Sequence, residues 1–459
     1  MDTQAYALGR ESPTTLAVNS MLQFSRRFSP LQVAFFGGAI ATTATVSLFG
    51  PVWCSSVRAA LQDSPKAVVD EVWQLVNREY VDGTFNHVNW QATRQTLLSK
   101  SYTSKEQAYA AIRVALARLG DPYTRFLDPK QYVALTDQTS GEMSGVGIRM
   151  ELNQKTKRLT VVEALEKSPA LKAGIKAGDQ ILAVDGKSTL GMKVEDASKL
   201  IRGKANSPVT LRIGRQGQSN FDVKLTRAQL ELATVHYTLK QEGSKRVGYI
   251  SLREFSSNAP EQMRRAIADL TRQQVDGFVL DMRGNPGGLL DASIQIGRMW
   301  LENGAIVRTV DRVGDSEQMT ANHTALTKKP LVVLVDSNSA SASEILSGAL
   351  QDDRRAVVVG SQTFGKALVQ SVHSLSDGSG VAVTVAHYFT PKGTDINHKG
   401  ITPDIKIDLT DAQLRQLATN PDLIATQVDP QYARAIAVLA ANSFAQFPQN
   451  QPLKPLSSQ

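Results

Sequence analysis

Apolar residues recur at helical spacing in the stretch that begins at Ser64. The positions that share one face are Val68, Val72, Val76 and Tyr80. Ser64-Pro65 supplies a helix cap followed by proline at the first helical position. A second helix is predicted from Ser104, with Gln107 completing a capping box, to Gly120. The pattern predicts a helical domain over residues 64–140 without chemistry of its own.

Short alternating runs of apolar and polar residues replace the helical spacing from about Gly141. Strands are predicted at 159–163, 180–184 and 209–213, with one short helix at Val194–Ile201. This change of period marks a separate, strand-rich domain.

Strands and helices alternate from Val247 onward. The predicted order is strand 247–252, helix 261–273, strand 277–281, helix to 300, strand 330–335, helix to 350, strand 356–359 and an extended run at 381–388. This order is typical of an α/β domain, in which ligand-facing turns lie at the C-terminal ends of the strands. We assign 229–410 to this core, and 411–459 to a C-terminal helix and a polar tail that is disordered after about Phe444.

An apolar stretch without charge lies near the amino terminus. Arg26-Arg27 precedes the run Leu31–Trp53, and small residues follow as far as Ala59 and Ala60. A basic segment followed by an apolar one predicts, over residues 1–60, a signal peptide cleaved near these alanines. The alternative is an uncleaved membrane anchor, because about 20 apolar residues can span a bilayer. Glycine and hydroxyl residues make the run only mildly hydrophobic, which favours cleavage.

Composition and charge exclude several classes of protein. Of 459 residues, 42% are hydrophobic and 20% charged, which is ordinary globular composition and excludes a mostly disordered chain. The net charge of +8 is scattered, without the basic stripe or reading motif of a nucleic-acid binder. Cys54 is the only cysteine, so an internal disulfide is impossible.

A serine-rich turn between a predicted strand and a predicted helix offers a candidate nucleophile. The turn spans Asp336–Glu344, and within it Ser341 and Glu344 also match a simple capping box. There is no G-x-S-x-G elbow and no histidine in these turns, so a Ser-His-Asp triad has little support. A desolvated lysine can replace histidine as the base, because burial disfavours the charged amine. Lys366, between Phe364 and Leu368, lies in such an apolar segment. The alternative, which holds for most isolated lysines, is a solvated lysine in a loop.

The segment Gly360–Ala367 nearly matches the sequence motif of a phosphate-binding loop, G-x-x-x-x-G-K-[ST]. Ala367 stands where a hydroxyl residue would hold magnesium, and Leu368–Leu375 alternates like a strand. Without a following helix, an anion site loses the helix dipole and most of its N–H donors. Nucleotide binding is therefore not expected, and no metal site or cofactor is assigned.

The stretch S-P-A-L-K-A-G-I-K-A-G-D-Q-I-L-A-V-D-G, Ser168–Gly186, resembles a PDZ domain of the bacterial, circularly permuted kind. We assign this domain to 141–228. The resemblance implies that backbone N–H groups of one loop bind a peptide C-terminus while the peptide adds a strand to the sheet. The predicted peptide-binding residues are Ser144, Gly145, Val146, Gly147 and Ile148.

From about Ser64 to Ile407 the chain resembles the C-terminal processing, or tail-specific, serine peptidases. The motifs that carry the resemblance are D-M-R-G-N-P-G-G, S-A-S-A-S-E-I, T-F-G-K-A-L-V-Q and Y-F-T-P-K-G-T-D-I-N-H-K-G-I-T-P-D, in the order of the family. The resemblance implies a multidomain α/β protein: a helical N-terminal domain, an inserted PDZ domain and a Ser-Lys peptidase core of the crotonase/ClpP-like kind. The roles it implies are nucleophile for Ser341, general base for Lys366, lysine positioning for Gln370, oxyanion hole for the N–H groups of Gly287 and Ala342, and support for Glu344.

The family also suggests a substrate and a compartment. Trp73–Trp90 resembles the cyanobacterial and chloroplast-lumen branch, which trims the C-terminus of the photosystem II reaction-centre precursor. An exported enzyme in the periplasm or thylakoid lumen is therefore expected, with protein C-termini as partners. The alternative is a catalytically inactive PDZ adaptor that only binds C-termini. An adaptor would need neither Ser341 nor Lys366, so their joint presence favours the peptidase.

Overall fold

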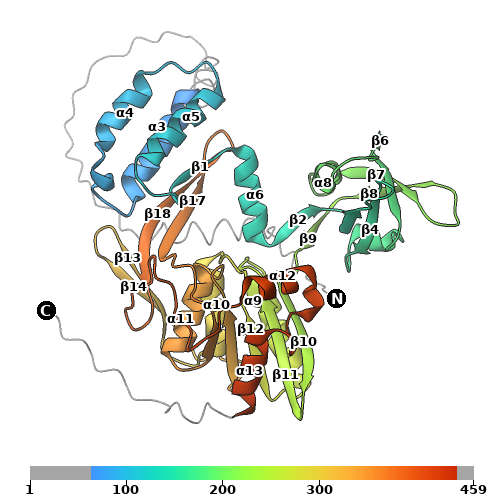
Figure 1. Ribbon diagram of the computed structural model, residues 1–459. Coiled ribbons are helices and arrows are strands. Elements are labelled where there is room, and N and C mark those ends of the chain that lie inside the picture. The colour runs from blue at the N-terminus through green and yellow to red at the C-terminus, as the bar shows by residue number, and fades with distance from the viewer. Residues whose placement is uncertain (1–63, 442–459) are drawn as a thin grey trace, which may run out of the picture. The chain divides into compact units, whose positions relative to one another are not determined.

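A computed structural model describes residues 64–441 of the chain. The predicted signal peptide or anchor at 1–60 and the tail after Phe444 lie outside these residues. The chain forms two compact units (Figure 1). Of the described residues, one unit contains 64–132 together with Gln370–Thr384, and the other contains Val133–Val369 and 385–441.

The first unit is mainly helical. Its elements are α3 (Pro65–Glu79), η1 (Phe85–His87), α4 (Trp90–Ser99), α5 (Lys105–Ala117) and β1 (Arg125–Leu127). The predicted apolar face of α3 is confirmed, since its valines and Tyr80 are buried. Ser104 caps α5 by accepting from the Gln107 N–H, whereas Ser64 makes no side-chain cap bond. The unit also includes 370–384, which the sequence did not predict: β1 pairs with the first half of β18 (Gly380–Phe389), which β17 (Leu368–Ser374) also joins.

The second unit begins with α6 (Pro129–Ser140), which spans the boundary, and continues into the predicted PDZ domain. The strands are β3 (Ile148–Leu152), β4 (Leu159–Ala164), β5 (Gln180–Val184), β6 (Lys187–Ser188), β7 (Pro208–Gly214) and β8 (Phe221–Thr226). They pair antiparallel in the order β3-β4-β5-β7-β8, with β6 on β5. The helices α7 (Pro169–Lys172) and α8 (Val194–Ile201) pack against this sheet. The strands β2 (Glu142–Gly145) and β9 (Ala228–Glu231), which precede and follow it in the chain, pair with each other as a separate two-stranded sheet. Three predicted strands and the predicted helix are confirmed.

The core of the second unit is a sheet in the order β10-β11-β12-β15-β16-β19. Figure 1 labels β10, β11 and β12 of this sheet. The bounds are β10 (Val235–Glu242), β11 (Lys245–Leu252), β12 (Gly277–Asp281), β15 (Leu331–Val335), β16 (Val357–Gly360) and β19 (Ile405–Lys406). Only the β10–β11 pair of this sheet is antiparallel. The predicted α/β order is confirmed.

Helices cover both faces of this sheet. Alternate residues of β12 and β15 pack against α9 (Ala259–Arg272), α10 (Leu290–Trp300) and α11 (Ala342–Asp352). The intervening residues pack against α13 (Pro430–Ala440) on the opposite face. Two covered faces explain why β15 reads as the unbroken apolar run LVVLV.

The remaining elements are a hairpin and a short C-terminal helix pair. They are β13 (Ala305–Asp311), β14 (Ser316–Thr320), α12 (Asp411–Thr419) and η2 (Pro421–Leu423). In this unit β13 pairs with the second half of β18.

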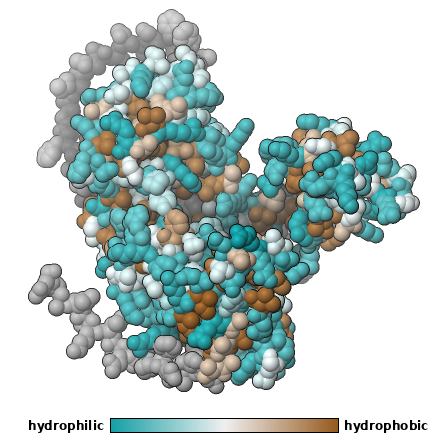
Figure 2. All heavy atoms as spheres, in the orientation of Figure 1, coloured by the Kyte–Doolittle hydropathy of each residue, from teal (hydrophilic) through white to brown (hydrophobic). Residues whose placement is uncertain are grey.

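Hydrophilic side chains cover most of the face seen in Figure 2, with apolar side chains in small groups. Between residues 64 and 441, the helices are all too short or too polar to cross a bilayer.

Candidate active site

Three turns meet at one edge of the central sheet. Because β12, β15 and β16 are parallel neighbours, their C-terminal ends lie at the same edge. The glycine turn (282–288) follows β12, the serine turn (336–341) follows β15 and the lysine loop (361–367) follows β16. The fold therefore brings together the three segments that carry the predicted catalytic residues.

Ser341 has a strained backbone at the start of α11. Its φ of 54° and ψ of −113° lie outside the conformations that a residue with a side chain prefers. Such strain costs about 1–3 kcal/mol and persists where the surrounding structure enforces it, often at functional sites. Ala342 follows as the first residue of the helix, where backbone N–H groups lack intrahelical acceptors. Ser341 thus lies on a sharp strand-to-helix turn although the sequence has no G-x-S-x-G motif.

Glu344 connects the serine turn to the lysine loop. Its side chain is fully buried, and its Oε2 accepts from the N–H groups of Ser341 at 2.8 Å and Lys366 at 2.9 Å. Its Oε1 accepts from the Gly365 N–H at 2.7 Å and from the Thr363 hydroxyl at 2.5 Å. Glu344 is therefore more than a helix cap, because it fixes the backbone of both predicted catalytic residues.

Tyr388 makes a second bridge between the same two residues. Its hydroxyl, on β18, lies 3.1 Å from the Ser341 carbonyl oxygen and within hydrogen-bond distance of the Lys366 carbonyl oxygen. The side chain is 2% exposed, and its single O–H proton is shared between the two acceptors. No role was predicted for Tyr388, although this residue opens the motif Y-F-T-P-K-G. Its place is decided by the pairing of β18 with β13.

Gly287 lies directly against the serine. Its φ is +102°, and a Cβ there would be 2.7 Å from the Ala340 carbonyl oxygen, 2.9 Å from Ser341 Cβ and 3.0 Å from Ala342 N. Only glycine permits this approach. The Gly287 N–H donates to Asn285 Oδ1 at 2.9 Å. One of the two predicted oxyanion donors therefore already has an acceptor within the chain.

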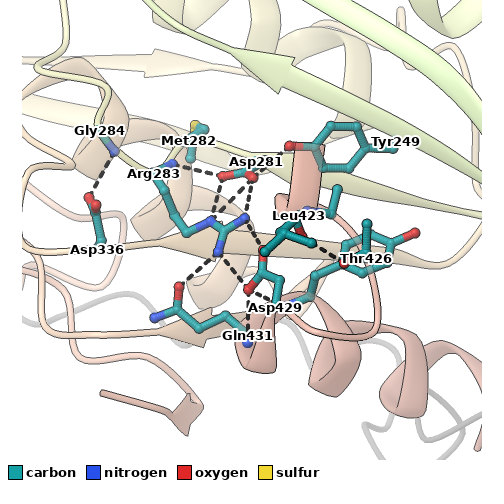
Figure 3. Close-up of polar contacts among 12 residues, drawn as sticks. Tyr249, Asp281, Met282, Arg283, Gly284, Asp336, Leu423, Thr426, Asp429 and Gln431 are labelled. Carbon is teal, nitrogen blue, oxygen red and sulfur yellow. Dashed lines mark hydrogen bonds and ion pairs between the residues drawn. The ribbon is translucent and has the colours of Figure 1, made fainter. Parts of the chain in front are cut away.

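A buried charged cluster lies beneath the glycine turn (Figure 3). Arg283 donates to Asp281 and to Asp429, with the shortest N–O distances 2.7 Å and 2.8 Å. Burial alone would raise the pKa of Asp281, but the Arg283 charge and the hydrogen bond from Tyr249 hold it below its usual value. The carboxylates in turn raise the pKa of Arg283 above its ordinary value against the opposing effect of burial. The cluster keeps both signs of charge paired inside the protein.

Other predicted site residues have different surroundings. Gln370 belongs to the first unit, where its Nε2 donates to Thr384 Oγ1 at 3.5 Å, and its role toward Lys366 stays a prediction. Ser144 and Gly145 belong to β2. The carbonyl groups of Val146 and Gly147 accept from backbone N–H groups within the domain, at 2.9 Å each, and Ile148 begins β3.

The arrangement can support acyl transfer. A serine at a helix N-terminus has backbone donors beside it that suit a developing oxyanion. A lysine on a neighbouring loop offers a base in place of histidine. The backbone N–H groups of this lysine and of the serine donate to the same Glu344 carboxylate. Together with the inserted strand-rich domain, these features define the class of a serine-type peptidase.

Comparison with known proteins agrees with this class. Two family models match, the PDZ domain over residues 160–215 and peptidase family S41 over residues 246–407. The carboxyl-terminal-processing protease of Synechocystis sp. is 44% identical over 369 residues, which are 80% of this chain and 85% of that protein. The chloroplastic C-terminal processing peptidase of Tetradesmus obliquus is 39% identical over 353 residues, 74% of this chain and 76% of that protein.

A solved structure described as the photosystem II D1 C-terminal processing protease is 39% identical, covers 75% of this chain and 93% of that chain, and has a TM-score of 0.49. On the sequence relatives, the chain belongs to peptidase family S41, among the carboxyl-terminal-processing proteases. It is a serine-type peptidase with a PDZ domain, and the predicted family is confirmed. The two relatives described above are a cyanobacterial and a chloroplastic enzyme.

Proposed function

We propose that Ser341 and Lys366 form the catalytic pair of this peptidase. The observation that carries the proposal is the double bridge between them: Glu344 binds both N–H groups and Tyr388 lies at both carbonyl oxygens. Backbones tied in this way hold the serine turn and the lysine loop in one fixed relation. A nucleophile and its base need that fixed relation, because small displacements cost large factors in rate.

The proposed reaction follows from the residues around the serine. The neutral Lys366 amine takes the proton of the Ser341 hydroxyl, and Oγ attacks the scissile carbonyl carbon. The oxyanion is stabilised by the N–H groups of Ala342 and Gly287, the latter exchanging Asn285 Oδ1 for the substrate oxygen. The lysine ammonium then protonates the leaving amine. Water, deprotonated by the same lysine, hydrolyses the acyl-enzyme and restores the serine.

The PDZ domain is proposed to select substrates by their free C-termini. The motif S-G-V-G-I at 144–148 supplies backbone donors for a terminal carboxylate, and an edge strand can pair with the peptide. Peptides with a free carboxylate and an apolar last residue should compete with substrate better than the same peptides amidated at the C-terminus. Equal competition by the two forms would argue against capture of the terminal carboxylate.

We propose cleavage near the C-terminus of exported or lumenal proteins, including the photosystem II reaction-centre precursor. The resemblance of Trp73–Trp90 to the cyanobacterial and chloroplast-lumen branch supports this substrate. The apolar run at 31–53 supports export to the periplasm or thylakoid lumen. We also propose three domains: a helical N-terminal domain at 64–140, a PDZ domain at 141–228 and a peptidase core at 229–410. Gln370 is proposed to position the amine of Lys366.

The test is cleavage of tailed peptides by the purified protein, read by mass spectrometry. Ser341→Ala should abolish cleavage and leave binding of tailed peptides intact, and Ser361→Ala is the matched control in a neighbouring loop. Lys366→Arg should be as severe as the serine change, because arginine does not give up its proton near neutral pH. Wild-type turnover in Ser341→Ala would refute the nucleophile. Appreciable activity in Lys366→Arg would point to another base, with His398, whose backbone N–H donates to the Gly365 carbonyl oxygen, the first to examine.

A further inference from the structure

Asp429 is a buried carboxylate at the start of the C-terminal helix α13. It is 0% exposed and caps the helix by accepting from the N–H groups of Gln431 at 3.2 Å and Tyr432 at 3.3 Å. The Ala425 N–H also donates to it, at 3.2 Å. Helix capping accounts for the bonds from Gln431 and Tyr432, but Asp429 also binds the guanidinium of Arg283, 146 residues earlier in the chain.

Arg283 is held from two sides (Figure 3). On one side lies Asp281, at the end of β12. On the other, Arg283 donates to Asp429 Oδ1 at 3.0 Å, to Asp429 Oδ2 at 2.8 Å and to Gln431 Oε1 at 3.0 Å. The bidentate pair with Asp429 fixes the direction of the guanidinium plane as well as its charge. Removal of the Asp429 charge would leave the Arg283 guanidinium with Asp281 as its buried carboxylate partner, and the N–H groups that now donate to Asp429 would lose their charged acceptor.

Arg283 and Gly287 belong to the same turn, the glycine turn that follows β12. Arg283 precedes Gly287 by four residues in the glycine turn. The next residue, Gly284, donates its N–H to Asp336 Oδ1 at 2.9 Å, and the Asn285 carbonyl oxygen accepts from the Ala340 N–H at 3.1 Å. The serine turn therefore holds one side of the glycine turn, while the side chain of Arg283 anchors its start to α13.

We propose that Asp429 is a positioning residue for the oxyanion hole, acting through Arg283. The segment around residues 429–431 lies beyond the S41 match at 246–407, yet it sets the place of the Gly287 N–H. Without the Asp429 charge, the Arg283 side chain reorients toward Asp281 alone, and the glycine turn shifts against the serine turn. The proposal rests on the oxyanion role given to Gly287 in the proposed function.

The experiment compares Asp429→Asn with Tyr432→Phe. Tyr432 is equally buried on α13 and donates its hydroxyl to Glu242 on β10, so Tyr432→Phe weakens the helix anchor without touching Arg283. In Asp429→Asn, kcat on a short tailed peptide should fall about 10- to 100-fold with KM changed less than about threefold, since misplaced transition-state donors cost this much. Tyr432→Phe should keep kcat within about threefold of wild type.

A second readout follows the oxyanion directly. A peptide aldehyde forms a hemiacetal with the serine whose oxygen occupies the hole, so Asp429→Asn should weaken its binding by the factor lost in kcat. Binding of an uncleaved peptide to the Ser341→Ala protein should stay the same with and without Asp429→Asn. Arg283→Lys should also lower kcat, and its combination with Asp429→Asn should cost less than the product of the two single losses, because both act on one contact.

Wild-type kcat and aldehyde binding in Asp429→Asn would overturn the proposal, and so would an equal kcat loss in Tyr432→Phe. If Asp429→Asn does not fold, Gln431→Leu removes the other α13 acceptor of Arg283 and should show the same kcat-specific loss in a milder form. Unchanged kcat in that variant would equally overturn the proposal. Absence of cleavage by the wild-type protein itself would instead refute the proposed function.

Discussion

Replacing Gly287 with alanine should damage catalysis far more than replacing Gly284 in the same turn. Both glycines have a positive φ, +102° and +70°, so each alanine introduces backbone strain of about 1–2 kcal/mol. The surroundings differ. A Cβ at Gly284 would meet nothing within 4 Å, whereas at Gly287 it would lie 2.7 Å from the Ala340 carbonyl oxygen and 2.9 Å from Ser341 Cβ.

The collision gives the size of the effect. Ordinary contact with a Cβ begins near 3.4 Å, so the glycine turn and the serine turn must move apart by up to about 0.7 Å. That movement would take the Gly287 N–H away from the position proposed for the developing oxyanion. Loss of one oxyanion donor lowers kcat by about 100- to 1,000-fold. Gly284→Ala should stay within about fivefold of wild type, because its strain lowers stability without moving the serine.

The assay is initial rate on a short tailed peptide at saturating concentration, with the free energy of unfolding measured by urea for both variants. Similar destabilisation with a kcat difference of at least about 20-fold between the two variants is the expected result. Equal kcat in Gly287→Ala and Gly284→Ala would refute the placement of Gly287 in the oxyanion hole.

Three further changes probe the supports of the site. Glu344→Gln places an amide where four donors now converge, leaving donors unsatisfied at about 1–3 kcal/mol each, so both urea stability and kcat should fall; unchanged kcat would contradict the bridging role. Tyr388→Phe removes only the shared hydroxyl and should lower stability by about 1 kcal/mol and kcat measurably, whereas full activity would show that Glu344 suffices. The folded-state pKa of Asp281 is lowered, so its stabilisation is present above the unfolded pKa near 3.8 and is lost as pH falls below it. Urea titrations between pH 5 and 3 should therefore show a shallower fall in unfolding free energy for Asp281→Asn, and an unchanged slope would contradict the pairing with Arg283.

Local sequence determined most elements of this protein. The valines of α3 and the apolar run of β15 depend on the periodicity of one segment, and the structure confirms both. The strand predicted at 180–184 is also confirmed as β5, but its burial does not alternate, because the pairing with β7 is irregular between Ile181 and Ala183. The serine turn and the lysine loop were predicted in the same way, because each directly follows a strand whose pattern is visible in the chain.

Tertiary structure decided what those residues contact. Neither periodicity nor spacing shows that Glu344 receives four donors, since three of them belong to the lysine loop and depend on β15 and β16 being neighbours. The strained φ of Ser341 is likewise imposed by packing, as the sequence lacks the usual elbow.

The pairing of Asp429 with Arg283, 146 residues apart in the chain, could not be predicted from the sequence around either residue. Asp429 before Pro430 predicts no more than the start of a helix. Its pairing with Arg283 exists because α13 packs on one face of the sheet, with its first turn near the end of β12. A buried charge can be tolerated only where the fold supplies its partner, and the order of strands and helices that supplies it is a property of the whole chain, which no single segment encodes.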